Sequence, residues 1–259
     1  SDAELAQSAA ERALFMLQQG TTTLEAKTGY ALDVAGELRL LRIILDLRKS
    51  TPQDILPTYL WAHAVPPEFV GDAEGYTRLL VEQALPQLKG WWQERYPQER
   101  YPFVDVFCEP SVFNIKNTRA ILSTACQLGF PLKIHVDEFE NIGGVPLAVE
   151  LGATSADHLV KTNKEDIAKL AQSNTVAVAL PCTPFGLAEQ NYTPAQQIIA
   201  QNGYLALASD LNPGTAWCGN MQFVLALACR FMKLTPAQAI AAATINAAAA
   251  INMDHQVGS

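Results

Sequence analysis

The sequence predicts an α/β protein, a TIM-like (β/α)8 barrel that lacks its first strand. Strand-length apolar runs alternate with amphipathic helical patterns along the chain, which is typical of βαβ units and a parallel sheet. The 259 residues suffice for one large core, and α/β barrels of this size commonly form one domain. Seven strands are found where a closed barrel has eight, and no strand precedes the opening helical segment 3–19. We therefore expect residues 1–259 to form a single, partial barrel domain.

Each predicted strand is a run of β-branched and apolar residues that closes on polar or special residues. The runs have the length of strands rather than of helices, and turn-forming residues separate them from their neighbours. The seven predicted strands cover residues 21–28, 56–64, 104–109, 131–138, 154–160, 175–181 and 204–210.

The segments between these strands carry the spacing of amphipathic helices, and several have recognisable ends. A hydroxyl N-cap before a proline at the first helical position predicts helix starts at Thr193-Pro194 and at Thr235-Pro236. Glycines stand where C-terminal caps belong, at Gly129, Gly152 and Gly203. Segment 91–102 is expected to be a surface excursion. After the first helix, the predicted helices cover 36–49, 72–92, 117–129, 143–152, 164–172, 193–203 and 216–233.

The composition opposes several classes of protein. A hydrophobic fraction of 49% and a charged fraction of 17% are typical of soluble globular proteins. A net charge of −8 without a stripe of Lys and Arg opposes nucleic-acid binding. The Ala-rich run 239–251 is too short for a membrane span, and the N-terminus does not resemble a secretory signal. Five single cysteines without a CxxC pair oppose a zinc knot and favour reduced thiols in the cytoplasm.

Candidate functional residues gather where predicted strands end, and this is where (β/α)8 barrels place their active sites. Three of the four histidines, His63, His135 and His158, stand at or near strand ends. Asp210 closes the last strand, and Glu138 follows His135 by three residues. Imidazole and carboxylate groups bind divalent metals that keep a position open for water. The pattern therefore predicts a metal and acid/base cluster, and with it a hydrolase.

Simpler interpretations of the same residues remain open. A single strand-end histidine more often satisfies a local hydrogen bond than binds a metal, and Asp210 alone could form an Asx turn or a helix cap. Glu25 and Lys27 are expected to form a buried ion pair inside the barrel. Other residues are given structural or exposed positions: Cys108 and Cys182 in the packing, and His255 in an exposed tail.

Several stretches of the sequence resemble those of the imidazolonepropionase family within the amidohydrolase superfamily. KIHVDEF, ADHL and SDLNPGT are the most specific of them, whereas LTPAQA and the Ala-rich segment resemble many amidohydrolases. The resemblance covers nearly the whole chain. The remaining stretches, which follow in the family's order, are TTTLEAKTGYAL, WAHAVP, DVFCE, LGATSADHL, LPCTPFGL and ASDLNPGT.

The resemblance implies one metal ion, zinc or iron, with His135 and Asp210 as ligands beside an HxH pair from the first strand. The chain contains no HxH. It also lacks the family's small β-sandwich domain, so we expect the chain to be a piece of a longer enzyme. An arginine upstream of Ser1 is expected to bind the substrate's carboxylate.

The resemblance also assigns roles to individual residues. It makes Glu138 the acid/base and a substrate contact, His158 a group that positions or polarises the reacting carbon, and Asp210 a proton acceptor. Tyr30 and His63 are expected to contact substrate, although Thr28 and Ala31 near Tyr30 depart from the family's pattern. The remaining expected substrate contacts lie in one loop, at Asn212, Gly214 and Thr215.

The activity implied is hydrolysis of the cyclic amide of 4-imidazolone-5-propanoate to N-formimino-L-glutamate, in histidine degradation, by an enzyme that is typically a homodimer. The implied partner is this small molecule, with no nucleic acid and no membrane. Three alternatives are retained. A deaminase or cyclic-imide hydrolase would share the same strand-end ligands, a Schiff-base barrel would use Lys27 or Lys133, and the isolated chain could be an inert scaffold.

Overall fold

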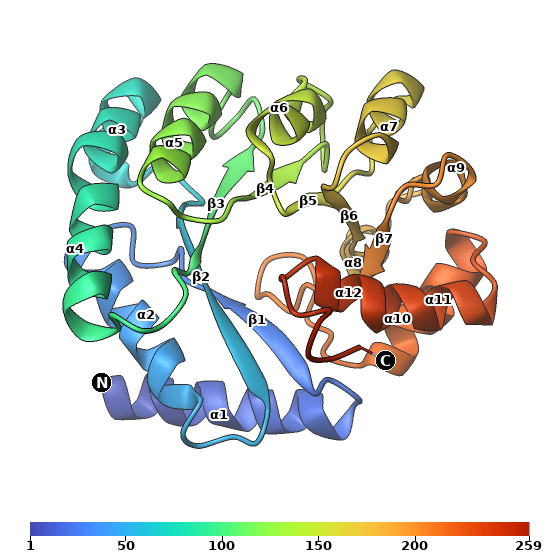
Figure 1. The fold of residues 1–259 in the computed structure, drawn as a ribbon, viewed down its shortest axis with the longest axis horizontal. Coiled ribbons are helices and arrows are strands. Elements are labelled where there is room, and N and C mark those ends of the chain that lie inside the picture. Colours follow the sequence, from blue (N-terminus) through green and yellow to red (C-terminus); the bar gives the residue numbers. More distant parts are fainter. Residues whose placement is uncertain (259) are drawn as a thin grey trace.

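The computed structural model describes residues 1–258, and its centre is a curled parallel sheet of seven strands in the order β1 to β7. Figure 1 shows the strands as an arc with most helices along its outer side. The predicted α/β class with parallel βαβ units is therefore confirmed. The strands are β1 (Thr23–Lys27), β2 (Asp54–Ala62), β3 (Phe103–Cys108), β4 (Lys133–Val136), β5 (Ser155–His158), β6 (Val176–Ala179) and β7 (Leu205–Leu207).

Helices follow the strands in the predicted alternation. Three helices near the C-terminus, α10 to α12, lie beside β7 (Figure 1). The helices before β4 are α1 (Asp2–Gln18), α2 (Val34–Leu47), the 3-10 turn η1 (Pro67–Phe69), α3 (Ala73–Leu79), the π-turn η2 (Leu80–Ala84), α4 (Leu85–Arg95) and α5 (Ile115–Gln127). The later ones are α6 (Gly144–Leu151), α7 (Lys164–Ala171), α8 (Cys182–Gly186), α9 (Ala195–Ala200), α10 (Met221–Phe231), α11 (Pro236–Ala243) and α12 (Ile245–Ala249).

Several predicted boundaries and caps differ from the structure. The helix expected over 216–233 begins only at Met221, because the Asn220 side chain accepts the Phe223 N–H and caps α10 there. The expected surface excursion at 91–102 is partly wrong, since α4 runs to Arg95 and Trp92 is buried. The predicted N-cap at Thr193 is also wrong, because its hydroxyl instead donates to the carbonyl of His158 at 2.6 Å. The Thr235 cap is confirmed, with a complete capping box.

Alternate residues of each strand face opposite sides of the sheet, as the two-residue period of a strand requires. Val104, Val106 and Ile134 point outward into the main core beneath the helices. The opposite face is apolar on β6 and β7, where Val176, Val178 and Ala206 form a small cluster with Ala250. On β1, β3, β4 and β5 that same inner face carries the charged side chains described below.

Gly144 lets α6 approach β4 closely, just after the segment that carries His135 and Glu138. A Cβ at this position would collide with Val136 Cγ1, a branched and buried side chain that has little room to move. By contrast, a Cβ at Gly90 in α4 would meet nothing within 4 Å. The absence of a side chain at Gly144 therefore sets the distance between α6 and the strand beneath it.

We predict that Gly144→Ala lowers the free energy of unfolding by about 1–3 kcal/mol, because the added methyl overpacks the contact with Val136. Gly90→Ala is the matched control and is expected to raise it by about 0.5–1 kcal/mol through better helix propensity. Urea denaturation of both variants measures the two changes. Equal effects of the two substitutions would contradict the close approach of α6.

Candidate functional site

A network of charged side chains fills the inner face of the sheet. Lys27 Nζ donates to Glu25 Oε1 and to Asp105 Oδ2, both at 2.7 Å. Lys133 Nζ lies 3.2 Å from Glu25 Oε2 and donates to the Ala250 carbonyl, also at 3.2 Å. The expected ion pair of Glu25 and Lys27 is thus confirmed, although both side chains are partly rather than fully buried. Burial opposes the charge on Glu25, but Lys133 and Lys27 outweigh it and lower the pKa of that carboxyl to about 2.

This network opposes the Schiff-base alternative for Lys27. Burial acts to lower the pKa of the Lys27 ammonium, but the carboxylates of Asp105 and Glu25 outweigh it and hold the pKa above its ordinary value. A protonated amine has no free electron pair to attack a carbonyl, so Lys27 is not a nucleophile in this arrangement.

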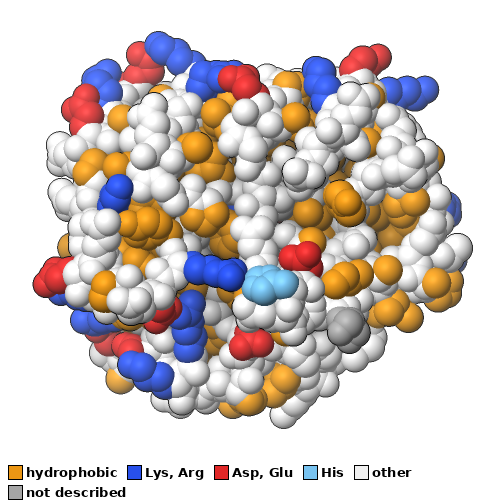
Figure 2. All heavy atoms as spheres, viewed as in Figure 1, with side chains coloured by type: hydrophobic (Ala, Val, Ile, Leu, Met, Phe, Trp, Pro, Cys, Tyr) orange, Lys and Arg blue, Asp and Glu red, His pale blue; other side chains and the backbone are white. Residues whose placement is uncertain are grey.

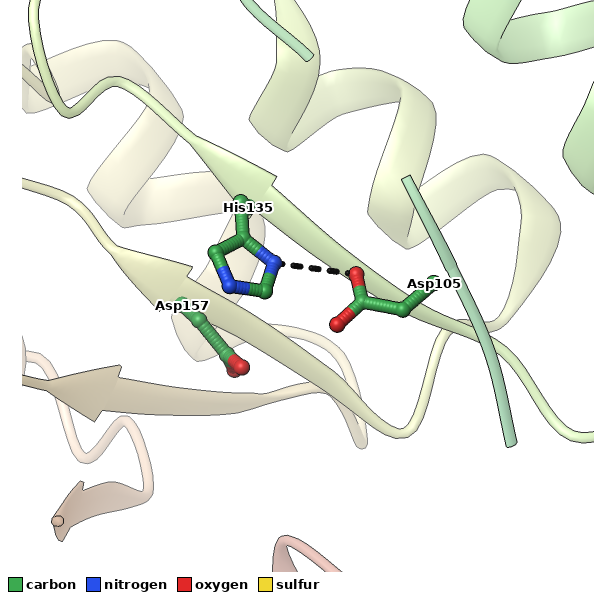
Figure 3. A group of neighbouring side chains, drawn as sticks. All are labelled: Asp105, His135 and Asp157. Atoms are coloured by element: carbon green, nitrogen blue, oxygen red, sulfur yellow. Dashed lines mark hydrogen bonds and ion pairs between the residues drawn. The ribbon is translucent and has the colours of Figure 1, made fainter. Parts of the chain in front are cut away.

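His135 stands above this network on β4, with its imidazole held by Asp105 of the neighbouring strand. Its Nδ1 lies 3.0 Å from Asp105 Oδ1, and both side chains are buried. Figure 3 shows the second ring nitrogen, Nε2, on the side of the ring away from this bond. Burial alone would lower the pKa of His135, but the Asp105 carboxylate raises it to about 9. The bond to Asp105 therefore fixes the orientation of the imidazole ring.

Asp105, His135 and Asp157 together offer ligand atoms within 4.8 Å of one another, a separation compatible with a shared metal ion (Figure 3). The two carboxylates, however, are already engaged. Asp105 binds His135 and Lys27, while Asp157 accepts the Ser155 hydroxyl at 2.6 Å and lies within 4.0 Å of both Lys27 and Lys133. Ammonium groups this close oppose a cation. We therefore take His135 Nε2, rather than these two carboxylates, as the ligand that the group supplies.

Glu138 follows β4 in a turn held by a buried carboxylate. Glu109, at the end of β3, accepts the backbone N–H groups of Glu138 at 2.9 Å and of Phe139 and Glu140 at 3.2 Å. Asp137 in the same turn has a φ of 55°. Glu109 is the last residue of the predicted strand 104–109, and its carboxylate fixes the backbone that carries Glu138.

Glu138 and His158 face each other across the ends of β4 and β5. His158 Nε2 lies 3.5 Å from Glu138 Oε2, and the rings of His135 and His158 have centroids 5.2 Å apart. Burial raises the pKa of Glu138 to about 7, with His135 lowering it and Asp210 adding to the rise. Burial lowers the pKa of His158 to about 4 although Asp210 opposes this change. The Glu138 carboxyl can thus exchange protons near neutral pH, whereas the His158 side chain is a neutral imidazole.

Asp210 follows β7 and is oriented by Thr183, whose hydroxyl donates to Oδ2 at 2.6 Å. The Asx-turn alternative for its side chain is wrong, because Asn212 forms that turn instead, accepting the N–H groups of Gly214 and Thr215 at 2.8 Å. Asn212 Nδ2 also donates to the Asp210 carbonyl at 2.8 Å. The loop that carries the three expected substrate contacts is therefore tied directly to Asp210.

Left-handed backbone marks three of these strand ends. Asp137, His158 and Asp210 have φ values of 55°, 78° and 53°, which is uncommon for residues other than glycine. Thr193 holds the strained His158 through its carbonyl. Such strain persists where surrounding contacts over-determine it, and it gathers at functional sites.

A row of rings connects the expected substrate contacts to His135. Tyr30 meets His63 edge-on at a centroid distance of 5.1 Å, His63 lies 6.0 Å from Phe107, and Phe107 lies 6.1 Å from His135. His63 Nδ1 lies 3.1 Å from the Gly29 carbonyl, which can only accept, so Nδ1 carries a proton. Burial raises the pKa of Tyr30, and the charge of Asp210 adds to the rise.

A cavity lies beside this group of residues rather than among them. It has a volume of about 430 Å³ and is lined by residues of α1 and of the loop from Leu211 to Asn220, including Arg12 and Trp217. It contains none of His135, Glu138 and His158. The loop that follows Asp210 forms one of its walls.

The residues present fit a metal ion. His135 presents Nε2 while a carboxylate holds Nδ1, an arrangement common among metal-binding histidines. Asp210 adds a carboxylate whose orientation Thr183 fixes. His158 Nδ1 is a buried nitrogen without a hydrogen-bond partner in the described part of the chain, so the cluster has unused polar capacity. These are imidazole and carboxylate donors, the set that suits zinc and iron.

Two kinds of comparison agree on the family. Residues 121–259 match the family model described as Amidohydrolase family. The chain is 48% identical over its whole length to an imidazolonepropionase from Herpetosiphon aurantiacus, of which it covers 61%. It is 42% identical over 245 residues, 95% of the chain, to an imidazolonepropionase from Streptococcus gordonii, of which it covers 77%. The chain thus spans about three fifths of the first of these relatives.

Solved structures share the fold at low sequence identity. A guanine deaminase from C. acetobutylicum with bound guanine has a TM-score of 0.74 at 14% identity, and the match covers 99% of this chain and 64% of that one. An adenosine deaminase from Xanthomonas campestris with bound zinc has a TM-score of 0.66 at 16% identity, with coverage of 100% and 59%. No helix within residues 1–258 is long and apolar enough to cross a membrane. By its sequence and its fold, the chain belongs to the amidohydrolase family, among the imidazolonepropionases.

Proposed function

We propose that the chain contributes the catalytic barrel of an enzyme that hydrolyses 4-imidazolone-5-propanoate to N-formimino-L-glutamate. One observation carries this proposal beyond the family's name: Glu138 and His158 lie 3.5 Å apart with pKa values moved in opposite directions, to about 7 and about 4. Pairs of titratable groups whose surroundings separate their pKa values are typical of acid/base sites. The curated relatives named above are imidazolonepropionases.

His135, through Nε2, and Asp210, through its carboxylate, would hold the metal, which we propose to be zinc or iron. Such an ion supplies Lewis acidity, which lowers the pKa of water from 15.7 to about 7. Thr183 and Asp105 orient the two ligands without occupying His135 Nε2.

Glu138 accepts the proton of the attacking water at a carboxylate oxygen and returns it to the ring nitrogen that leaves. The water oxygen joins the amide carbon as the ring carbon–nitrogen bond breaks; one hydrogen of the water goes to the new carboxyl group and the other to the released nitrogen, both in the single ring-opened product. A pKa near 7 suits a group that must both accept and give back a proton near neutral pH. The three N–H bonds to Glu109 keep the backbone of this turn in place.

His158 acts as a neutral hydrogen-bond donor to the carbonyl oxygen as negative charge develops there. Its lowered pKa keeps it uncharged, so it stabilises the oxygen without surrendering its proton. Asp210 serves as a further proton acceptor. Substrate is contacted by Tyr30 and His63 on one side, and by the loop of Asn212, Gly214 and Thr215 on the other.

We further propose that residues 1–259 form one catalytic domain of a cytoplasmic homodimer. The continuous seven-stranded sheet supports the first statement. The homodimer and the cytoplasmic location rest on the family resemblance. Sedimentation of the purified protein tests the oligomeric state.

Replacing Glu138 with Gln is predicted to lower kcat for imidazolone hydrolysis by about 10²–10⁴-fold, since the amide cannot shuttle the proton. Glu140→Gln, an exposed acid two residues away, is the control and should change kcat little. Turnover is followed by loss of the imidazolone chromophore, with guanine, cytosine and hydantoin as competing substrates. A loss below tenfold in Glu138→Gln, or faster turnover of a competing substrate, would contradict the proposal.

Metal retention separates the proposed ligands from the Asp105, His135 and Asp157 group. Asp210→Asn is predicted to weaken metal binding by more than the 10–100-fold typical of outer-shell changes. Asp157→Asn should retain the metal, because that carboxylate serves the lysines. Metal content after dialysis, measured by mass spectrometry, checks both variants. Loss of metal in Asp157→Asn with retention in Asp210→Asn would reverse the assignment.

A further inference from the structure

Within residues 1–258, Asp105 is the only group that hydrogen-bonds the His135 ring, and both of its oxygens are in use. Oδ1 lies 3.0 Å from His135 Nδ1, and Oδ2 accepts from Lys27 Nζ at 2.7 Å. The Asp105 side chain is fully buried, so water cannot substitute for either partner. The residue therefore faces two donors at once, an ammonium and an imidazole N–H.

Only a carboxylate can satisfy both donors. An ionised Asp is an acceptor at each oxygen, whereas Asn offers one acceptor and one NH₂ donor. Lys27 has no acceptor capacity, so it always requires an oxygen on this side. With the first oxygen used by Lys27, the second must face His135 and demands a proton on Nδ1.

We propose that Asp105 is a positioning residue that, fixed by Lys27, holds His135 with its proton on Nδ1 and leaves Nε2 free to bind the metal. This inference rests on the proposed function only in taking His135 as a ligand. The carboxylate itself does not touch metal or substrate. Lys27 takes part by determining which way the group at position 105 must face.

The Asp105→Asn substitution is expected to move the ring proton of His135 from Nδ1 to Nε2. The Asn oxygen turns to the Lys27 ammonium, because a charge-assisted bond is the stronger one, and the NH₂ group then faces His135. Nδ1 must become the acceptor, so the ring proton moves to Nε2 and blocks metal binding. Metal affinity should fall about 10–100-fold, the range typical when the partner of a metal-binding histidine is lost.

Lys27→Met supplies the rescue. Without the ammonium, the Asn oxygen is free to accept from Nδ1, so the double variant Lys27→Met/Asp105→Asn should regain the metal affinity of Lys27→Met alone. Lys27→Met/Asp105→Ala has no acceptor at position 105 and should remain 10–100-fold weaker. This pair decides the question even if Asp105→Asn alone does not fold. Asp157→Asn is the matched control, because it removes one carboxylate from the same network without a bond to His135.

Two measurements test the proposal. Ring ¹⁵N shifts of His135 in the metal-free protein, recorded at a pH at which the ring is neutral, report which nitrogen carries the proton. Competition with a chromophoric chelator gives the zinc affinity of each variant. We expect the Nδ1–H form in the wild type, in Asp157→Asn and in the double Asn variant, and the Nε2–H form in Asp105→Asn.

The proposal is overturned if Asp105→Asn keeps the Nδ1–H form and its zinc affinity. It is also overturned if the double Asn variant binds zinc no better than the double Ala variant, since Asp105 would then act only through stability. A protein that shows the expected tautomers and affinities yet does not turn over imidazolone supports this inference and contradicts the proposed function instead.

Discussion

The site depends on a network of charged side chains on the inner face of the curled sheet, in which each charged group lies beside a group of opposite charge. Glu25, Asp105 and Asp157 face Lys27 and Lys133 on the inner side of the sheet, where removing one partner leaves a buried charge that costs several kcal/mol. The three carboxylates carry one negative charge more than the two ammonium groups can balance. His135 lies against Asp105, one of these carboxylates. The network therefore supports the imidazole from below and leaves its free nitrogen toward the strand ends.

Most of the fold was predictable because strand and helix patterns alternate regularly along the chain. All seven predicted strands are present, with boundaries that differ by a few residues. The errors fall where a side chain makes a tertiary bond in place of a local one. Thr193 has the sequence of a helix cap, yet its hydroxyl holds His158 across a sequence distance of 35 residues. Local propensity carries no information about such a partner.

Part of the candidate site, the grouping of its main residues, was also predictable. Strand-end position brought attention to His135, Glu138, His158 and Asp210, and the contacts and charge couplings of the structure bring these four together. Their catalytic roles rest on the proposal above. Asp105, Asp157 and Thr183 were missed because they do not stand at the ends of the predicted strands. For Asp105 and Asp157 the sequence does carry a signal, because a polar residue two positions from an inward-facing residue of the same strand lies on the same face of the sheet. Thr183 had none, because only the fold places it beside Asp210.

We propose that His135 and Asp210 share one metal ion at the carboxyl ends of the strands. Anomalous diffraction from crystals of the metal-loaded protein, collected on both sides of the metal's absorption edge, tests it most directly. We expect one peak about 2.0–2.2 Å from His135 Nε2 and from an Asp210 oxygen. A peak bound instead by the carboxylates of Asp105 and Asp157 would contradict it.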